Sequence, residues 1–325
     1  MGSSKAPRIV VAGAGVLGLA IAWTLAVRGY AVTVRDPAPG GPNASSIAAG
    51  LLAPIGEAVF DPAAAGHFLL LSHAFGLWRD FAEQSQIRLL MGETIVPSIM
   101  ATCLSELGAK VSSRDGSAIY RGDAHVAYPL EALNQLRARA VTAGARFEAA
   151  CLTQVEPGAL TIIASGPGAS QLTGLALELI CLTPIKGQIA VLPNGPVEGP
   201  VHRWSGGYLV PQTGGARAGA TMEEGRFDTA SEAEVVARLA SAAAERVPGL
   251  DVSASYGLAG VRMATPDGLP LVGPSRTSNV LLAAGARRNG WLLAPLVAEV
   301  IAAYVAGKDP GPWAQALHPS RFDQQ

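Results

Sequence analysis

The feature that most constrains this 325-residue chain is a glycine-rich turn between an apolar segment and a helical pattern near its N-terminus. Residues 9–13 predict a buried strand, and the turn GAGVLG at residues 13–18 follows at once. Residues 17–28 then predict a helix, and residues 31–35 predict a second strand that ends at Asp36. A strand, a GxGxxG turn, a helix and an acid after the next strand make up a dinucleotide-binding fingerprint, so we expect an α/β fold of the Rossmann type.

Each glycine of the fingerprint has a mechanical role. Gly13 permits the tight turn, Gly15 lets the backbone approach a pyrophosphate, and Gly18 lets the helix pack on the strand. The helix N-terminus, with Val16 and Leu17, offers free N–H groups and the positive end of the helix dipole to phosphates. An ordinary α/β unit with a glycine turn is the alternative that this pattern leaves open.

The acidic residue of the fingerprint indicates what kind of ribose is bound. Asp36 follows Gly13 by 23 residues, which suits a carboxylate that accepts hydrogen bonds from a ribose diol. Its charge argues against a 2′-phosphate, although the neighbouring Arg35 weakens that argument. The fingerprint by itself does not separate FAD from NAD.

Composition excludes several classes of protein. Hydrophobic residues make up 49% of the chain and charged residues 15%, with a net charge of −1, so we expect a compact globular protein with neither a nucleic acid nor a membrane as partner. Cys103, Cys151 and Cys181 form no CxxC pair, so we expect small buried side chains in a reducing, cytoplasmic compartment. We recognise no export signal, no membrane-spanning stretch and no metal-ligand cluster.

The order of the other elements extends the α/β interpretation. A Pro-, Gly- and Ser-rich loop is expected over residues 37–54 and helices over 63–85 and 129–143. From Lys186 onward, short strand-like segments separated by Gly and Pro predict a mixed or antiparallel sheet, with one helix inserted at residues 231–247. Residues 280–305 return to a strand, a glycine-containing loop and a helix. We therefore expect a Rossmann-type domain with an interleaved mixed or antiparallel sheet.

Six ordered motifs give the chain a family resemblance. It resembles the glycine oxidase and D-amino acid oxidase group of FAD-dependent amine oxidoreductases, and the resemblance covers most of the chain. The ASSIAAG loop and the RNGWLLAP segment are most similar to those of glycine oxidases of thiamine biosynthesis. The motifs are GAGVLG with Asp36, ASSIAAGLLAP (44–54), IKGQ (185–188), GYLVPQ (207–212), AGVRMATPDGLPLVG (259–273) and AAGARRNGWLLAP (283–295).

This resemblance implies a non-covalently bound FAD. It assigns residues 1–77, 119–184 and 257–325 to a discontinuous FAD-binding domain, and residues 78–118 and 185–256 to a substrate-binding domain. By resemblance, the fingerprint and Asp36 hold the ADP part of FAD, and the adenine lies near Leu152. The stretch between the pyrophosphate and the flavin is lined by Ala44, Ser45, Ala49, Gly50 and Leu51. The isoalloxazine lies along Arg288, Asn289, Gly290, Trp291 and Leu292.

The resemblance also implies a substrate site. Arg262 and Tyr208 match the arginine and tyrosine that grip a substrate carboxylate, and Arg288 lies in the substrate-facing segment. A fork of guanidinium donors suits two carboxylate oxygens, and a phenol adds a third hydrogen bond. The residues Ala286 and Arg287 depart from the family pattern, which leaves their effect on the pocket open.

The implied reaction is oxidative deamination of a small amino acid, with glycine favoured. Hydride would pass from Cα to flavin N5, and the products would be an imine or 2-oxo acid, ammonia and, with oxygen as acceptor, hydrogen peroxide. A sarcosine or small D-amino acid oxidase, or a dehydrogenase, remains open. So do a flavin-binding module without amine oxidation, an NAD-dependent dehydrogenase and a homo-oligomer.

Overall fold

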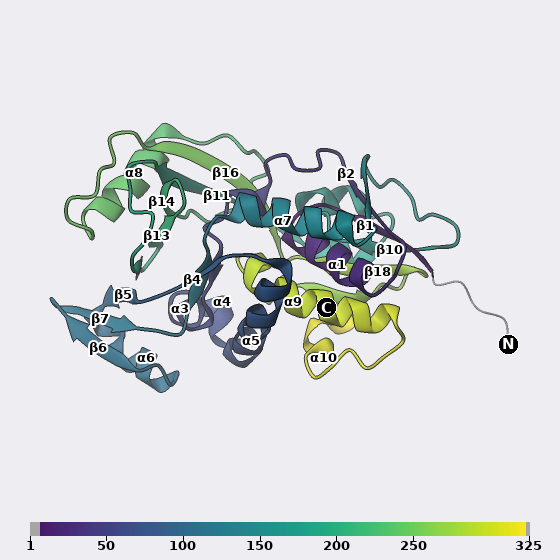
Figure 1. Ribbon diagram of the computed structural model, residues 1–325, viewed down its shortest axis with the longest axis horizontal. Helices are drawn as coiled ribbons and strands as arrows, with labels where there is room; N and C mark the ends of the chain where they lie inside the picture. The colour runs from purple at the N-terminus through teal and green to yellow at the C-terminus, as the bar shows by residue number, and fades with distance from the viewer. Residues whose placement is uncertain (1–6, 323–325) are drawn as a thin grey trace.

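The computed structural model describes residues 7–322 of the chain. These residues form three sheets, which meet near the start of the long helix α9 (Gly290–Val305). In Figure 1 the parallel sheet lies at the right, and the strands of the largest sheet spread over the left side of the molecule.

The parallel sheet has six strands and contains the predicted fingerprint. Every neighbouring pair in it is parallel except β17 and β18, which pair antiparallel. Its order is β17 (Leu271–Pro274), β18 (Val280–Ala284), β10 (Ala159–Ile163), β1 (Arg8–Ala12), β2 (Val32–Asp36) and β9 (Arg146–Ala149).

Alternate residues of β1 enter two separate cores, as the period of a strand requires. Ile9 and Val11 face the core that contains the helices, whereas Val10 and Ala12 face a smaller core under two 3₁₀ segments. The helices of the first face are α1 (Val16–Val27), α5 (Phe68–Ser85), α7 (Pro129–Thr142) and α9, and the 3₁₀ segments of the second are Gly166–Leu172 and Leu177–Cys181. A sheet covered on both faces explains why its strands are almost continuously apolar.

The largest sheet has nine strands and is mixed, as predicted. Only β12 and β5 pair parallel; the other pairs are antiparallel. Its strands in spatial order are β16 (Tyr256–Ala264), β11 (Thr183–Leu192), β14 (Gly215–Gly219), β13 (Gly207–Gln212), β12 (Val201–Trp204), β5 (Thr94–Pro97), β7 (Ser117–Tyr120) and β6 (Val111–Arg114), with β15 (Glu223–Glu224) on the first half of β11. Helix α8 (Ala233–Ala244) packs its apolar face on one side, which leaves the other side toward the parallel sheet.

A small third sheet and several short helices join the two large sheets. The third sheet consists of β3 (Leu51–Leu52), β8 (Ala124–Val126) and β4 (Leu89–Met91). The short helices are α2 (Ala44–Ile47), α3 (Pro54–Phe60), α4 (Pro62–Ala65), α6 (Ala101–Glu106) and α10 (Ala314–Leu317), and two more 3₁₀ segments cover Ser98–Met100 and Pro319–Phe322.

Two predicted segments differ in detail from the structure. The loop predicted over residues 37–54 contains α2 and β3, and α2 begins there because the Asn43 side chain accepts hydrogen bonds from the backbone N–H groups of Ser45 and Ser46. The single helix predicted over residues 63–85 is divided into α4 and α5, since α4 ends at a Gly66 cap.

The predicted domain limits can be compared with the element ends. The limits after residues 77, 118 and 184 lie inside α5, β7 and β11, and residues 257–264 belong to the nine-stranded sheet through β16. The two-domain division stays a prediction.

The prediction that the three cysteines are buried was wrong, although Cys181 comes nearest to it. Cys103 and Cys151 are exposed, Cys181 is partly buried, and all three are free thiols. Cys103 lies on the exposed side of α6, and Cys151 lies in the connection that follows β9, which a count of cysteines cannot reveal. Within residues 7–322, no helix combines the length and the apolar character needed to cross a membrane.

Candidate active site

A cavity of about 470 Å³ opens at the carboxyl ends of the parallel strands, where ligands bind in sheets of this kind. Most of the predicted cofactor residues line it: Gly13, Gly15, Val16, Leu17, Asp36, Ala44, Ser45, Leu152, Arg288, Gly290 and Trp291. These segments are far apart in the sequence, and the sheet order β2–β1–β10–β18 brings them together.

Two of the fingerprint glycines are required by close backbone packing. A Cβ atom on Gly13, whose φ is +107°, would lie 2.4 Å from the carbonyl oxygen of Ala164. A Cβ atom on Gly18 would lie 2.0 Å from the carbonyl oxygen of Gly13, so the helix can approach the strand only without a side chain there. A Cβ on Gly15, in contrast, would meet only the Ser45 hydroxyl, at 3.5 Å, and Gly15 faces the cavity. Gly18 itself does not line the cavity.

Asp36 faces the cavity and also organises the turn. One carboxylate oxygen accepts a hydrogen bond of 2.8 Å from the Ala14 backbone N–H, and the other accepts one of 2.9 Å from Ala38 N–H. The charge of the neighbouring Arg35 is balanced by Glu148 and Glu156, with which it forms ion pairs. The guanidinium of Arg35 is thus already paired with two carboxylates, so its charge no longer weakens the argument against a 2′-phosphate.

The segment formed by α2 and the residues just after it is held by side chains of the nine-stranded sheet. The buried guanidinium of Arg217 donates to the carbonyl oxygens of Ser46, Ile47 and Ala48, with the first at 3.1 Å. Gln212 donates to the carbonyl of Ala49 at 2.6 Å. Sequence analysis missed both residues, since nothing in a strand segment announces a distant loop carbonyl as its partner.

The same segment is tied to the cavity from the opposite side. Ser45 Oγ accepts a hydrogen bond of 3.1 Å from Val16 N–H in the first turn of α1, and the Ser45 carbonyl accepts one of 3.0 Å from Trp291 Nε1. The N-termini of α1 and α9 thus meet at one serine. Both helix N-termini direct free N–H groups and positive dipole ends into this cavity.

A smaller cavity of about 70 Å³ adjoins the first and lies under the nine-stranded sheet. It is lined by the predicted substrate residues Tyr208, Arg262 and Arg288, together with Leu51 and Glu57. The predicted cofactor residues Ala49, Gly50 and Asn289 also line this smaller cavity, and Arg262, Arg288 and Trp291 line both. Leu292 lines neither, because its side chain is completely buried in the core beneath α9.

Strand register explains how Tyr208 and several arginines come to share one face. Residues directly opposite in a sheet point the same way, and Tyr208 is opposite Arg203 on β12 and Gly219 on β14. Val210, two residues further along β13, is opposite Arg217, so this side chain also belongs to the inner face. The outer face carries the apolar residues that α8 covers.

Arg262 enters the smaller cavity past a glycine. Its Nη2 donates to the Thr221 carbonyl at 3.1 Å, and a Cβ on Gly187 would lie 2.1 Å from the same nitrogen. The glycine of the IKGQ motif therefore makes room for this guanidinium. Burial lowers the pKa of Arg262 to about 10, so it is still protonated at neutral pH.

Glu57 is the functional side chain that the motif analysis missed. It is 3% exposed, and it bridges Arg203 Nη2, at 2.8 Å from Oε1, and Arg288 Nε, at 3.2 Å from Oε2. Burial acts to raise the pKa of Glu57, but Arg288 and Arg203 outweigh it and hold the pKa below its ordinary value. Glu57 lies three residues after Pro54, which ends the ASSIAAGLLAP motif and begins α3. This nearness to a cofactor motif was the signal in the sequence that could have identified Glu57.

The charge balance of this cavity favours an anion. Burial raises the pKa of Tyr208, although Arg262, Arg288, Arg217 and Arg203 all oppose that rise, so its hydroxyl remains a hydrogen-bond donor. Two arginines, Arg262 and Arg288, line the cavity together with one carboxylate, Glu57. A guanidinium fork, a phenol and surplus positive charge suit a carboxylate ligand.

The residues of the large cavity fit FAD. Its glycine turn leaves backbone room at Gly15, the carboxylate of Asp36 lines it at the end of β2, and two helix N-termini face inward.

Comparisons with known proteins agree with this interpretation. The family model described as FAD dependent oxidoreductase (DAO) matches residues 8–304. The glycine oxidase of Pseudomonas aeruginosa is 29% identical over 95% of this chain and 98% of its own length. The bifunctional protein ThiO/ThiG of Trichormus variabilis is 34% identical over 50% of this chain, and the match spans only 26% of that relative.

A solved structure extends the comparison to the fold. The glycine oxidase of Geobacillus kaustophilus superimposes with a TM-score of 0.82 at 26% sequence identity, covering 97% of this chain and 99% of the other. The expected α/β architecture with a mixed second sheet is thereby confirmed. From the span of the family match, the chain belongs to the FAD-dependent oxidoreductases of the D-amino acid oxidase type.

Proposed function

We propose that this enzyme oxidises a small amino acid, with glycine the favoured unsubstituted substrate. The observation that carries the proposal is the pairing of Arg262 and Tyr208 on the inner face of the nine-stranded sheet, in a cavity that adjoins the candidate FAD site. The names of the relatives, glycine oxidase among them, support the same substrate class. Non-covalently bound FAD would supply a two-electron acceptor, with oxygen reduced to hydrogen peroxide.

The side chains of the protein orient the substrate rather than exchange protons with it. Arg262 and Tyr208 would hold the carboxylate, which fixes Cα relative to the neighbouring cavity and promotes reaction by positioning. The phenol of Tyr208 keeps its proton, and Glu57 is ionised with both oxygens paired to arginines. A neutral amine held in this way would lose hydride from Cα to that acceptor and become an iminium ion, which water hydrolyses to a 2-oxo acid and ammonium.

The decisive experiment is an anaerobic absorbance titration of the purified holoprotein with glycine, sarcosine and D-alanine. Flavin bands that bleach with one of these amines would establish an amine oxidoreductase and name its substrate. Bands that never bleach would leave a flavin-binding module. Flavin that stays in the supernatant after acid precipitation would support non-covalent attachment.

The proposed chemistry predicts a particular pH profile. Because no described residue of the small cavity is placed to accept the ammonium proton, kcat/KM for glycine should rise with pH until the free amino acid is deprotonated. Steady-state rates measured over a pH series test this. A kcat/KM that is independent of pH well below the amine pKa would show that the enzyme removes this proton itself.

The electron acceptor distinguishes an oxidase from a dehydrogenase. Hydrogen peroxide formed in proportion to the amine consumed supports the oxidase. Reoxidation by a quinone but not by oxygen would assign a dehydrogenase instead.

A further inference from the structure

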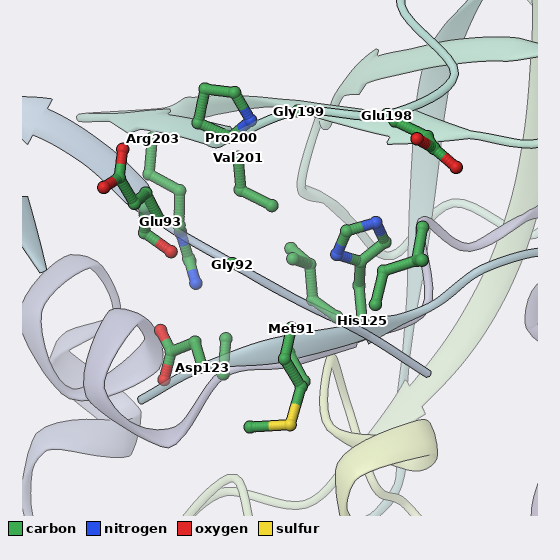
Figure 2. A pocket seen from close by; sticks show the side chains of 15 residues that line it. Met91, Gly92, Glu93, Asp123, His125, Glu198, Gly199, Pro200, Val201 and Arg203 are labelled. Carbon is green, nitrogen blue, oxygen red and sulfur yellow. The ribbon is translucent and has the colours of Figure 1, made fainter. Parts of the chain in front are cut away.

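The arginines near the small cavity differ in what holds them in place. Arg203 pairs with the buried carboxylate of Glu57, at 2.8 Å. It also lines a separate cavity of about 420 Å³, where Figure 2 shows it above a second carboxylate, that of Asp123. Arg262 pairs with no carboxylate of the described residues, and its Nη2 donates instead to the backbone carbonyl of Thr221. The direction of the Arg262 guanidinium therefore depends on where this one carbonyl lies.

Thr221 begins an exposed stretch of chain, residues 221–232, which we call the 221–232 segment. It contains β15 and ends where α8 begins. Met222 lines the small cavity, whereas residues 224–232 are all exposed. A segment with so little apolar packing is held in place mainly by its polar contacts.

Strand β11 contacts both the small cavity and this segment, because alternate side chains of a strand lie on opposite faces. Gly187 and Ile189 line the small cavity. Lys186 and Gln188 lie on the other face, which α8 covers, and both are 0% exposed. The IKGQ motif thus supplies a glycine that makes room for Arg262 and two buried polar side chains that require partners.

Gln188 joins the two ends of the 221–232 segment. Its backbone N–H donates to Thr221 Oγ1 at 2.9 Å, and its carbonyl accepts a hydrogen bond of 3.1 Å from Thr221 N–H. Its side chain donates to Glu223 Oε1 at 2.8 Å and accepts a hydrogen bond of 2.7 Å from Glu232 N–H. Thr221 Oγ1 donates to the same Glu223 oxygen at 2.6 Å. The Thr221 carbonyl therefore has little freedom to move away from the strand.

Two cations balance the acids of this segment. Lys186 Nζ lies 2.6 Å from Asp228 Oδ1 and 3.4 Å from Glu232 Oε1. Arg226 pairs with Glu223, Asp228 and Glu232, but these exposed pairs contribute little individually. The buried ammonium of Lys186 would lose both of its acidic partners if the segment moved away, and an unpaired buried charge is strongly unfavourable. Lys186 therefore favours the position of the segment in which Thr221 meets Arg262.

We propose that Gln188 and Lys186 are positioning residues for the substrate carboxylate. From the far face of β11 they hold the 221–232 segment so that the Thr221 carbonyl fixes the guanidinium of Arg262. This inference rests on the proposed function, because it deepens the role of the same Arg262 site. A guanidinium that is already oriented loses less side-chain entropy when a carboxylate binds, so it binds the carboxylate more tightly.

The first test removes the Thr221 hydroxyl, which links Gln188 N–H to Glu223. In Thr221→Val, KM for glycine and the Kd for acetate, read from the flavin spectrum of the holoenzyme, should rise together by about 10-fold. The flavin content and kcat should change much less. The matched control Thr229→Val removes an exposed hydroxyl of the same segment and should leave both constants at their native values. Equal rises in the two variants would overturn the inference.

The second test asks whether Gln188 acts through Arg262. Gln188→Met should lower kcat/KM for glycine by about 10-fold in the native background. In the Arg262→Met background the same change should alter kcat/KM by less than about two-fold, because no guanidinium is left to position. A merely structural residue would lower kcat/KM by the same factor in both backgrounds, and that result would overturn the inference.

The same comparison with Thr221→Val covers the case in which Gln188→Met does not fold. Thr221 is partly exposed, and valine keeps nearly the shape of threonine, so this variant removes the hydrogen bonds with little change in packing.

The outcomes separate this inference from the proposed function. Bleaching by glycine with the same KM in the native protein, Thr221→Val and Gln188→Met would keep the proposed function and overturn the positioning role. The proposed function itself would fail if no amine bleached the flavin and acetate bound equally well to the native protein and Arg262→Met. The positioning role would then fail with it.

Discussion

Arg262 is a buried guanidinium that donates a hydrogen bond to a backbone carbonyl and lines a cavity. The Thr221 carbonyl accepts one hydrogen bond from this guanidinium, and Gly187 leaves room for it without contributing a charge. Burial has lowered its pKa to about 10, so its charge is held in the protein at a cost that a carboxylate ligand would offset. Its single charge therefore matters more for substrate binding than for the stability of the fold.

Replacing Arg262 tests that role. In Arg262→Met, kcat/KM for glycine should fall about 100-fold or more, since charge-assisted hydrogen bonds contribute roughly 1.5–3 kcal/mol each. Steady-state kinetics, with flavin content measured in parallel, check this. The matched control Arg238→Met removes an exposed arginine of α8 and should change nothing. Unchanged kinetics in Arg262→Met would refute the assignment.

Burial shifts the pKa values of Asp123 and His125, which are two residues apart, in opposite directions. Burial raises the pKa of Asp123 to about 6, so between about pH 4 and pH 6 the folded state holds a proton that the unfolded state has released, and stability falls as pH rises. Burial lowers the pKa of His125 to about 4, so in the same window the unfolded state holds the extra proton and stability rises with pH. The two effects oppose each other in the native protein.

Single variants should separate these two effects. We compare the free energy of unfolding of each variant with that of the native protein at the same pH. As pH rises from about 4 to 6, this difference should shift in favour of Asp123→Asn and against His125→Gln. Each shift should be no more than about 1.4 kcal/mol per pH unit. Thermal unfolding of the holoprotein at several pH values measures both. Parallel pH profiles for all three proteins would contradict the assigned pKa directions.

At the scale of elements, the glycine turn between β1 and α1 combines an unusual backbone conformation with tight packing. Gly13 and Gly29 both have positive φ, +107° and +85°, but only at Gly13 would a Cβ meet another atom within 4 Å. The two positions therefore separate conformational strain from steric exclusion.

Gly13→Ala and Gly29→Ala form a matched pair. Gly29→Ala should cost about 1 kcal/mol through strain alone and keep its flavin. Gly13→Ala should lose more stability and most of its flavin, because the turn must move away from Ala164. Melting temperature and flavin absorbance per protein measure the difference. Full flavin content in Gly13→Ala would argue against a cofactor site at this turn.

The sequence was informative where a function depends on neighbours in the chain. The roles of Gly13 and Gly18 follow from one local strand–turn–helix unit, and the predicted sheet and helix positions are confirmed there. The partners of Arg203, Arg217 and Glu57 depend instead on strand register and on where α3 begins. A one-residue shift of register would turn Arg203 to the α8 side, and hydrophobic periodicity does not fix that choice in a strand that is buried on both faces.

At the scale of the whole molecule, the candidate FAD cavity exists only when distant segments have come together. Its walls include residues of β1, β2, α2, β16 and β18, and of the 3₁₀ segment Gly166–Leu172 that follows β10. A ligand held by so many separate segments binds the folded chain and has no comparable site in the unfolded one. Binding and global stability are therefore linked.

Removal of the cofactor should accordingly lower the melting temperature. Added FAD should raise the melting temperature again in a concentration-dependent way. The free energy of unfolding should increase by about 2.7 kcal/mol when the free FAD concentration is 100 times its Kd. A thermal-shift titration of the apoprotein with FAD measures this. Parallel titrations use AMP and riboflavin, each of which represents one part of FAD. A melting temperature that does not depend on added FAD would oppose the site.

The packing of α1 against α9 has a consequence for protein synthesis. Helix α1 is apolar on nearly all sides and contacts α9, which begins only at Gly290, while β10 receives β18 only at Val280. During synthesis, α1 therefore leaves the ribosome long before residues 290–305 of α9 have been made. We expect the nascent chain to bind chaperones that shield apolar segments until then, and the parallel sheet can be completed only after β18 has been synthesised.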